Sequence, residues 1–424
     1  MSDLPQTRGL RVVDVERCHV RVPFTERTRP WNEILVGQWG VVEVIRLTTN
    51  ASGIVGYGET LPHYSWSDVS DEAIAAVIGQ NPAEFLGHDE LGSGLQMALY
   101  DAVGRAMEVP ARRLFGLPQV RDRVPLAWWN TKMAPEVLAE EAAEAVRSGY
   151  LHHKFKARPW FDVFEQVAAI AAVTPPHYRL DIDWNEMLRD VGTAAPVLQE
   201  LDREERVGIY ETPIRFGDLE GFRRLRDKTS RPIADHIKQS AFSAAVRAEA
   251  FDGYVIEGGV ANAISGGLNA DAFNKPYWLQ IVGPGLTTAL TLQLGAVLPG
   301  AVWPSVTCLN IYSDDLIVDP IEISGGYATV PDGPGLGVEV DESALTRLAM
   351  EAPYTVDYPV SILTISWPGG RACHYATVQD MWQDCRIGNV PAQDRGARLT
   401  VRHDDGTAEF AALRAKAAVH PVRA

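Results

Sequence analysis

The chain has 424 residues, of which 46% are hydrophobic and 22% charged, the composition of an ordinary globular protein with a large core. It holds 39 basic and 55 acidic residues, a formal net charge of −16, which argues against a nucleic-acid partner because such a partner requires a basic face. An anionic small substrate stays compatible with this charge, since a metal ion or a lysine pair can reverse the field inside one cleft.

The cysteines and the hydropathy pattern bear on the compartment. The four cysteines contain no C-x-x-C motif and indicate reduced thiols. Residues 1–18 carry charges throughout and lack an apolar core, so we expect no signal peptide. No run approaches the roughly 18 apolar residues that a membrane span needs. We therefore expect a soluble, cytoplasmic protein without a membrane partner.

The first part of the chain predicts an α+β unit. Leu10–Arg21 alternates between apolar and polar residues, and Val41–Thr49 with Ile54–Glu59 forms a hairpin pattern around a turn rich in Asn, Ser and Gly. The period then becomes helical over Asp71–Ile78 and Gly92–Met107. Strands followed by helices of this kind indicate a small antiparallel sheet with helices on it.

From Val124 to about Pro304, short apolar runs alternate with amphipathic helical stretches. This alternation indicates right-handed βαβ units and a parallel sheet, and the number of units favours a closed barrel. No G-x-G-x-x-G follows the early strands, which weakens a dinucleotide-binding interpretation. The runs are VPLAWW, YLHHKFK, YRLDIDW, VGIYETP, RPIADH, GYVIEGG and YWLQIVG, and the helical stretches are Ala134–Ser148, Phe161–Thr174, Val191–Leu201, Asp218–Thr229 and Thr287–Leu298.

We therefore predict an α/β fold: a (β/α) TIM-type barrel with an N-terminal α+β capping domain and a C-terminal extension. The predicted boundaries are 1–123 for the capping domain, 124–345 for the catalytic barrel, and 346–424 for a segment that returns to the cap and continues as an extension. The last segment has mixed strand-like pieces and no repeat, so its structure is not specified further.

The second predicted barrel strand ends in His152-His153-Lys154-Phe155-Lys156. Period-two alternation places Lys154 and Lys156 on one face and Phe155 on the other. Two neighbouring lysines repel each other, which tends to lower at least one pKa and to provide a base near neutral pH. Two solvated lysines on an edge strand are the alternative that this motif alone leaves open.

Each of the next three strands ends with an acidic residue: Asp183, then Glu211, then Asp235. Barrel active sites lie at the carboxyl ends of the strands, so these carboxylates should meet. Alone, each would more often cap a helix or face solvent. Together they form the oxygen ligand set that a hard cation such as Mg²⁺ prefers.

These motifs, in this order, resemble the enolase superfamily in the branch of mandelate racemase and muconate lactonising enzyme. The resemblance runs from about residue 10 to 345. It includes Gly56-Tyr57-Gly58-Glu59, Ala98-Leu99-Tyr100-Asp101-Ala102, Leu114-Phe115-Gly116, Lys154-Phe155-Lys156, Asp183-Trp184-Asn185, Glu211-Thr212-Pro213, Asp235 and Pro331-Asp332-Gly333-Pro334-Gly335-Leu336-Gly337.

The resemblance implies that Asp183, Glu211 and Asp235 hold Mg²⁺, which would make the α-proton of a carboxylic acid removable. It implies an acid/base role for Lys156 and a tuning or carboxylate-binding role for Lys154. Asp181 lies on the same face as Asp183, but the match to D-x-N favours Asp183 as the ligand. A homo-oligomer and a small carboxylate substrate are also implied by the family.

Substrate contacts are expected from three further residues. Asn185 completes the D-x-N match at the end of its strand. Substrate identity in the family is set largely by cap loops, here residues 25–40, where Trp31 and Asn32 are candidates for substrate binding. Ordinary loop roles for these two residues are equally compatible with the sequence.

The second acid/base of the family is not evident in this chain. Matched on its apolar core, the sixth strand puts Glu257 where the family has a lysine; matched on Gly266-Gly267, it puts Ala261 there. The seventh strand contains no histidine, so His236, next to the third carboxylate, is a candidate substitute or a structural histidine. Cys308 and Asn310 near the eighth strand are further candidates.

Because only one base is evident, we favour elimination of water from a sugar acid or related hydroxy acid. A racemase, epimerase or cycloisomerase of a carboxylic acid, with His236 or Glu257 as the partner, is the alternative. A barrel that binds a metal or ligand without catalysis is a third possibility, although it would have little need of a lysine pair beside a metal site.

Overall fold

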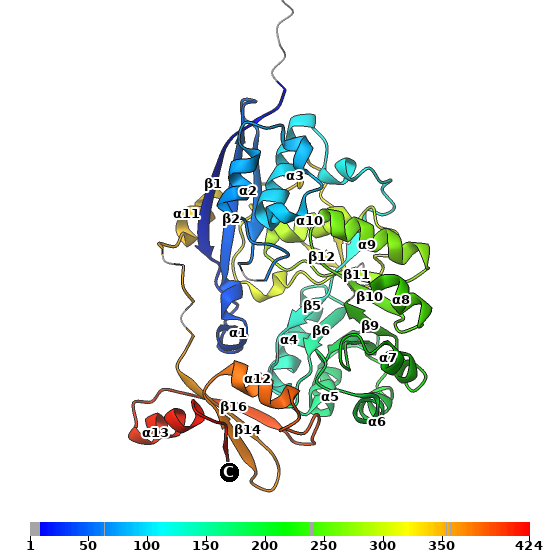
Figure 1. Cartoon of the computed structure of the whole chain (residues 1–424), viewed down its shortest axis with the longest axis vertical. Coiled ribbons are helices and arrows are strands. Elements are labelled where there is room, and N and C mark those ends of the chain that lie inside the picture. The colour runs from blue at the N-terminus through cyan, green and yellow to red at the C-terminus, as the bar shows by residue number, and fades with distance from the viewer. Residues whose placement is uncertain (1–8, 63, 237–240, 353, 357) are drawn as a thin grey trace, which may run out of the picture.

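The computed structural model describes residues 9–424 except 63, 237–240, 353 and 357. Residues 1–8, part of the stretch inspected for a signal peptide, lie outside the described residues. Figure 1 shows the cap at the top, the barrel to one side below it, and the last residues as a separate body at the opposite end. Among the described residues, no helix combines the length and apolarity needed to cross a membrane.

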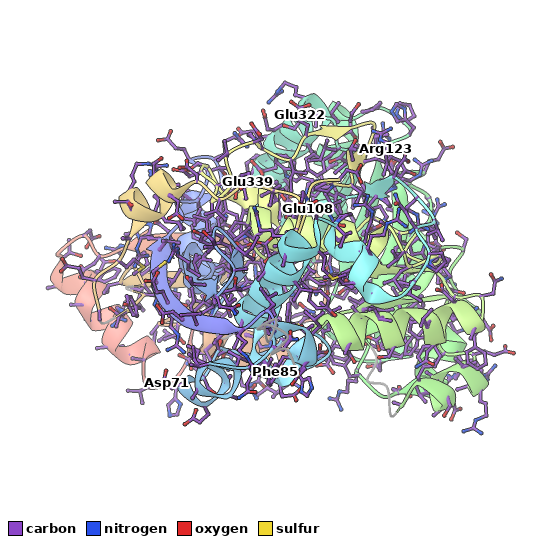
Figure 2. The ribbon with its side chains drawn as sticks, turned by 90° about the horizontal axis from the view of Figure 1, so that it is seen from above. Asp71, Phe85, Glu108, Arg123, Glu322 and Glu339 are labelled. Atoms are coloured by element: carbon purple, nitrogen blue, oxygen red, sulfur yellow. The ribbon has the colours of Figure 1, made fainter. Side chains whose placement is uncertain are left out.

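The cap is a three-stranded antiparallel sheet in the order β1-β2-β3, with α3 packed on it. Gly56 and Gly58 of β3 make this packing close, because an added Cβ would lie 2.1 Å from the carbonyl oxygens of Ala98 and Gly94 respectively. Figure 2 looks down on this cap and labels Asp71 at the start of α2. The elements are β1 Val12–Arg21, β2 Val41–Thr49, β3 Val55–Thr60, α1 Arg29–Leu35, α2 Asp71–Val77 and α3 Ser93–Met107.

The barrel is a seven-stranded parallel sheet in chain order from β5 to β11. Residues 305–306 close it, because Ser305 bridges Leu126 before β5 and Val306 bridges Gln280 after β11, both in parallel. The predicted fold class is thus confirmed. The strands are β5 Trp128–Asn130, β6 His152–Lys156, β7 Arg179–Asp183, β8 Val207–Glu211, β9 Ile233–His236, β10 Gly253–Ile256 and β11 Tyr277–Leu279.

Helices follow the barrel strands, and aspartates begin several of them. Asp162, Asp190 and Asp218 each accept hydrogen bonds from backbone N–H groups in the first turn of α5, α6 and α7, as helix N-caps do. These helices are therefore capped by aspartates other than the strand-end acids Asp183, Glu211 and Asp235. The helices are α4 Pro135–Arg147, α5 Val163–Val173, α6 Val191–Leu201, α7 Leu219–Arg226, α8 Phe242–Arg247, α9 Val260–Ala272 and α10 Gly285–Gly295.

Short elements join the barrel to the cap. After the barrel, α11 lies against β1, and the Met350 N–H donates to the His19 carbonyl at 2.8 Å. These short strands and helix are β4 Arg123–Pro125, β12 Ile323–Ser324, β13 Tyr327–Thr329 and α11 Glu342–Leu348. Short 3-10 helices lie at Gly37–Gly40, Pro82–Phe85, Asp89–Leu91, Ala111–Phe115 and Leu309–Ile311.

Residues 361–424, here called the C-terminal unit, form a four-stranded antiparallel sheet in the order β16-β14-β15-β17. Its apolar face packs in one cluster with Leu35 of α1 and with Trp160 and Phe161, which follow β6. The unit therefore covers loops at the carboxyl ends of the barrel strands (Figure 1). Its elements are β14 Ser361–Ser366, β15 Ala372–Tyr375, α12 Val378–Arg386, β16 Arg398–His403, α13 Ala408–Ala417 and β17 Val422–Arg423.

Candidate active site

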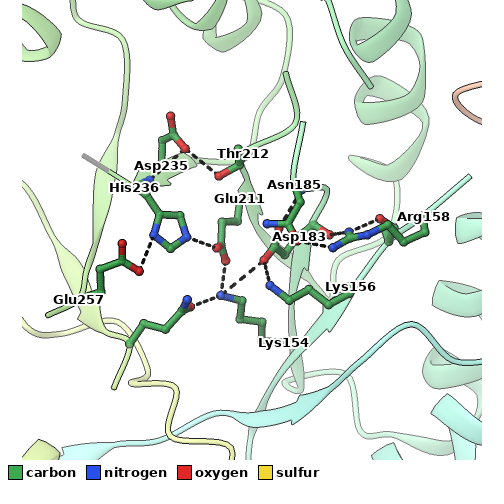
Figure 3. Close-up of polar contacts among 12 residues, drawn as sticks. Lys154, Lys156, Arg158, Asp183, Asn185, Glu211, Thr212, Asp235, His236 and Glu257 are labelled. Atoms are coloured by element: carbon green, nitrogen blue, oxygen red, sulfur yellow. Dashed lines mark hydrogen bonds and ion pairs between the residues drawn. The ribbon is translucent and has the colours of Figure 1, made fainter. Parts of the chain in front are cut away.

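Strand register brings the lysines and carboxylates together at the carboxyl ends of β6, β7 and β8. Lys156 lies opposite Asp183, and Asp183 opposite Glu211, on adjacent parallel strands. Alternation keeps Lys154 on the face of Lys156, whereas Phe155 points the other way into the core. Figure 3 shows the side chains of Lys154, Lys156, Asp183 and Glu211 converging.

Both lysines are paired with carboxylates. Lys156 Nζ contacts Asp183 Oδ2. Lys154 Nζ contacts Glu211 Oε2, lies 3.7 Å from Asp183 Oδ2, and donates to Gln280 Oε1 at 2.5 Å. Because Lys154, Asp183 and Glu211 are wholly buried, each charge needs its partner to remain ionised.

The surroundings shift the pKa values of the two lysines in opposite directions. Burial alone would lower the pKa of Lys154, but Glu211 and Asp183 outweigh burial and raise it. Burial lowers the pKa of Lys156, and the charge of Lys154 adds to this against the opposing effect of Asp183. The Lys156 and Lys154 ammonium groups hold the pKa of Asp183 below its usual range despite burial. Lys156 is therefore the lysine whose proton is more easily lost.

The opposite side of the cleft carries a histidine between two carboxylates. His236 Nε2 lies 3.0 Å from Glu211 Oε1, and His236 Nδ1 lies 3.2 Å from Glu257 Oε2 (Figure 3). Burial would lower the pKa of His236, but these two hydrogen bonds prevail and raise it to about 10. With a carboxylate acceptor at each ring nitrogen, the imidazole is held doubly protonated.

Asp235 is turned away from the other two carboxylates. Its Oδ1 accepts from Thr212 Oγ1 at 2.7 Å and from the backbone N–H of His236 at 2.9 Å. Burial raises the pKa of Asp235 to about 7, against the opposing effects of the Thr212 hydrogen bond and of the His236 charge. Among the described residues, Asp235 is thus the strand-end acid that no lysine contacts.

A cavity of about 570 Å³ opens between these groups. Lys156 lines one part of its wall, and His236 and Glu257 line another. Most of the remaining lining is polar, which suits a hydroxylated substrate. It consists of Tyr64, Ser65 and Trp66 from the cap, and of Asn185, Gly258, Asn262, Gln280, Ile281 and Val282 from the barrel.

Asn185 is in the cavity wall, as the D-x-N interpretation expects of a substrate-binding residue. It adopts a left-handed backbone conformation with φ of 41°, which Asn tolerates better than most residues. Its N–H donates to Asp183 Oδ1 at 2.9 Å, and Arg158 Nη2 donates to its side-chain oxygen. The side chain is thereby fixed in place beside the carboxylate.

The two cap candidates do not line the cavity. Asn32 is fully buried and donates to Thr28 Oγ1 at 3.0 Å within its own helical turn. Trp31 packs edge-on against Phe161, with ring centroids 5.7 Å apart. The cap residues that reach the cavity are Tyr64, Ser65 and Trp66, in a later loop.

Sequence reasoning missed three polar residues of the site. Gln280 directly follows β11, the seventh barrel strand, where the family pattern predicts a histidine. Arg158 continues the two-residue alternation of Lys154 and Lys156, a signal that was available. Asn262 lies on α9, a helix absent from the predicted set, and its proximity to the cavity has no sequence signal.

The residues fit a divalent cation by their chemistry. Three buried carboxylates at successive strand ends are a suitable oxygen donor set, and two of them already require a positive partner. In the described residues, however, no three acidic, histidine or cysteine side chains lie around one point that could hold a metal ion. Lysines contact Asp183 and Glu211, whereas Asp235 accepts a hydrogen bond from Thr212. The ammonium groups here neutralise the carboxylates that a cation would otherwise neutralise.

The fold and this cleft define a barrel enzyme with paired lysines and strand-end carboxylates. Residues 137–344 match the family model described as enolase C-terminal domain-like. An N-succinylamino acid racemase from an Amycolatopsis species is 30% identical over 63% of this chain and 74% of its own length. The chain belongs to the enolase superfamily, in the mandelate racemase/muconate lactonising enzyme family.

Other relatives carry different activities. A D-gluconate dehydratase from Thermoproteus tenax is 26% identical, with 74% of this chain and 71% of the relative covered. The crystal structure of a 2-chloromuconate cycloisomerase from Rhodococcus opacus superposes with a TM-score of 0.65 at 21% identity, covering 80% of this chain and 99% of the other. Members of the superfamily generally bind a divalent metal such as Mg²⁺. Dehydratases, cycloisomerases and racemases all occur among the relatives, so similarity alone selects none of these reactions.

Proposed function

We propose that this enzyme dehydrates a sugar acid or a related hydroxy acid. The observation that carries the proposal is the placement of His236, held protonated between Glu211 and Glu257, on the same cavity as Lys156. A base and a proton donor on one cavity are what elimination of water requires.

In the proposed reaction, Lys156 Nζ takes the proton from the α-carbon of the substrate. His236 then gives a proton to the β-hydroxyl group, the C–O bond breaks, and water leaves. The resulting enol tautomerises to a 2-keto-3-deoxy acid, so atoms and charges balance. Mg²⁺ held by Asp183, Glu211 and Asp235 would supply Lewis-acid stabilisation of the carboxylate when bound.

The hydrogen bond at Nδ1 is the one that a substrate can replace. The side chain of Glu257 is 59% exposed, whereas that of Glu211 is fully buried. A β-hydroxyl group entering the cavity can therefore take the place of the Glu257 oxygen and receive the Nδ1 proton. The contact from Nε2 to Glu211 would keep the ring oriented during this exchange.

The polar lining favours a polyhydroxy acid over a muconate. Side-chain amides of Asn185, Asn262 and Gln280 and the hydroxyl of Ser65 are donors and acceptors for sugar hydroxyl groups. The curated D-gluconate dehydratase and arabinonate dehydratase among the relatives support the same class. The donor set of Asp183, Glu211 and Asp235 and the membership of the superfamily support Mg²⁺ as the cofactor.

Racemisation or epimerisation is the second candidate, because His236 could return its proton to the α-carbon instead. Incubating the enzyme with Mg²⁺ and a panel of sugar acids in D₂O separates the two. We expect 2-keto-3-deoxy acid, detected as its semicarbazone, and no product from Lys156→Met. Deuterated substrate of inverted configuration without keto acid would replace dehydration by racemisation, and absence of both would reject the proposal.

A further inference from the structure

The C-terminal unit lies beyond the residues matched by the family model, which end at 344. It is attached to the loop after β6 by two hydrogen bonds at Asp162: the Asp162 N–H donates to the Ala397 carbonyl at 3.0 Å, and the Gly396 N–H donates to Asp162 Oδ2 at 2.8 Å. Trp382 of α12 packs edge-on against Trp160, with ring centroids 6.2 Å apart. One side of the barrel mouth is therefore walled by a unit that the family model does not include.

Beneath this wall lies a lysine without an anionic partner. Lys132 follows β5, and its ammonium lies 5.5 Å from the centroid of the Trp382 ring. Within the part of the chain that the structure describes, Lys132 makes no hydrogen bond and no ion pair, and it is only partly exposed. By contrast, Lys154, Lys156 and Lys275 each contact an oxygen atom.

A second cationic side chain, Arg158, lies over the ring of the same tryptophan. The Arg158 guanidinium carbon lies 4.7 Å from the Trp382 ring centroid, and the side chain is fully buried. It donates to the carbonyl oxygens of Ala157 and Asp183 and to the side chain of Asn185, and its Nε is unpaired. The Arg158 guanidinium is therefore held by hydrogen bonds to neighbouring residues, whereas the Lys132 ammonium is available to a ligand.

The neighbourhood of Lys132 is positively charged. Burial lowers its pKa, and the charges of Arg158 and Lys156 lower it further against the opposing effect of Asp183. An anion arriving beside the ammonium would offset this repulsion. Lys156 lines the catalytic cavity, so the positive region extends from that cavity toward the C-terminal unit.

We propose that Lys132, positioned against Trp382, binds a second carboxylate at the far end of the substrate, so that the enzyme takes dicarboxylic hydroxy acids. The inference rests on the proposed function in that it concerns the same substrate. The reacting carboxylate belongs at the ends of β7 to β9, and β5 lies two strand intervals from β7. Two intervals are on the order of 10 Å, a distance that a sugar diacid and the side chain of Lys132 span together.

Equilibrium binding tests the subsite without relying on turnover. With Mg²⁺ present, an aldaric acid and the aldonic acid of the same length and configuration are titrated calorimetrically into the wild type, Lys132→Met and Lys132→Arg. We expect the wild type to prefer the aldaric acid by about tenfold or more, the typical contribution of a charge-assisted hydrogen bond. Lys132→Met should lose this preference, and Lys132→Arg should retain most of it.

Two further variants separate binding from scaffold damage. Lys228→Met, which removes an exposed lysine on the outside of the barrel, should leave both affinities unchanged. Trp382→Ala should weaken binding of the diacid selectively, and Trp382→Phe should restore it, because Trp382 acts by positioning Lys132. Equal weakening of both acids by Lys132→Met, equal affinity of the wild type for both, or preference for a phosphorylated aldonic acid would overturn the proposal.

The outcome is distinguishable from a failure of the proposed function. If an aldaric acid binds through Lys132 but yields no 2-keto-3-deoxy acid, the subsite stands and dehydration is rejected. If aldonic and aldaric acids are dehydrated with equal kcat/KM in the wild type and in Lys132→Met, dehydration stands and the subsite is rejected.

Discussion

Buried carboxylates occur in two regions of this molecule, and their partners differ. In the cleft, Asp183 is contacted by Lys156, and the ammonium groups nearby hold its pKa below the usual range. At the seam between cap and barrel, Glu59 of β3 accepts from the Thr287 N–H at 2.7 Å, and no basic side chain of the described residues pairs with it. Burial raises the pKa of Glu59 to about 8.

The comparison shows that burial alone does not make an acid reactive. Both side chains are almost completely removed from solvent. A buried carboxylate stays ionised only when a cation compensates for the lost hydration, and otherwise it takes up a proton. An ionised acid can hold a metal or orient a lysine, whereas a protonated one serves packing. Substitutions in the cleft should therefore affect chemistry, and those at the seam should affect stability.

The largest effect should come from removing a cleft carboxylate. Asp183→Asn and Glu211→Gln should each lower turnover at least about a thousandfold, because Lewis-acid stabilisation worth several kcal/mol would be lost. Circular dichroism should show an intact fold. Asp218→Asn is the matched control: this acid caps α7, a role that Asn fills equally well. Full turnover after exhaustive chelation would contradict the metal assignment.

The next effect should come from Lys156. Lys156→Met should slow α-proton exchange into D₂O by about 10²–10⁴, the usual contribution of a general base, with little change in metal affinity. Lys156→Arg should not restore exchange, since guanidinium stays protonated. Exchange at the wild-type rate in Lys156→Met, measured by NMR of the recovered substrate, would move the base to the other side of the cleft.

A smaller and more selective effect is expected from the opposite side. His236→Asn should slow formation of keto acid by about a hundredfold or more while exchange of the α-proton continues, because only the proton donor is lost. Glu257→Gln should cost about tenfold, since the amide can still accept from Nδ1 but without charge. If exchange and keto-acid formation decline together, His236 acts before or with the proton abstraction.

How far the sequence determines this site can be judged from particular residues. Lys154, Lys156, Asp183 and Glu211 end consecutive strands, so the period of a strand and the barrel rule were sufficient to place them side by side. Lys132 and Trp382 meet only because a later unit folds back on the mouth, and no local pattern encodes that contact. The cap segment 25–40 shows a related limit: Trp31 packs against Phe161 and Asn32 donates to Thr28, and no local pattern separates such contacts from substrate binding.

The tail shows the same limit for the fold. The α+β cap and the barrel have clear periodicity, and their strands appear within a few residues of the predicted ranges. Residues 361–424 have short strands whose partners are distant in sequence, such as β15 with β17, so pairing could not be deduced from spacing. Helices α8 and α9 were missed because α8 is short and α9 contains Gly266 and Gly267 within its span.

The smallest effect should be found at the seam, in the pH dependence of stability. A carboxyl group whose pKa rises from 4.5 in the unfolded chain to about 8 in the folded protein stabilises fully below pH 4.5. This contribution is lost as pH rises to about 8, by at most about 1.4 kcal/mol per pH unit.

Glu59→Gln removes this titration while keeping the shape of the side chain and an oxygen for the Thr287 N–H. The free energy of unfolding, measured by denaturant titration between pH 5 and 8, should therefore decrease less steeply with pH in Glu59→Gln than in the wild type. The difference between the two curves isolates Glu59 from the neighbouring Asp315, whose charge adds to the shift and is present in both proteins. Parallel curves would mean that Glu59 is ionised when buried, and the contrast between seam and cleft would then be lost.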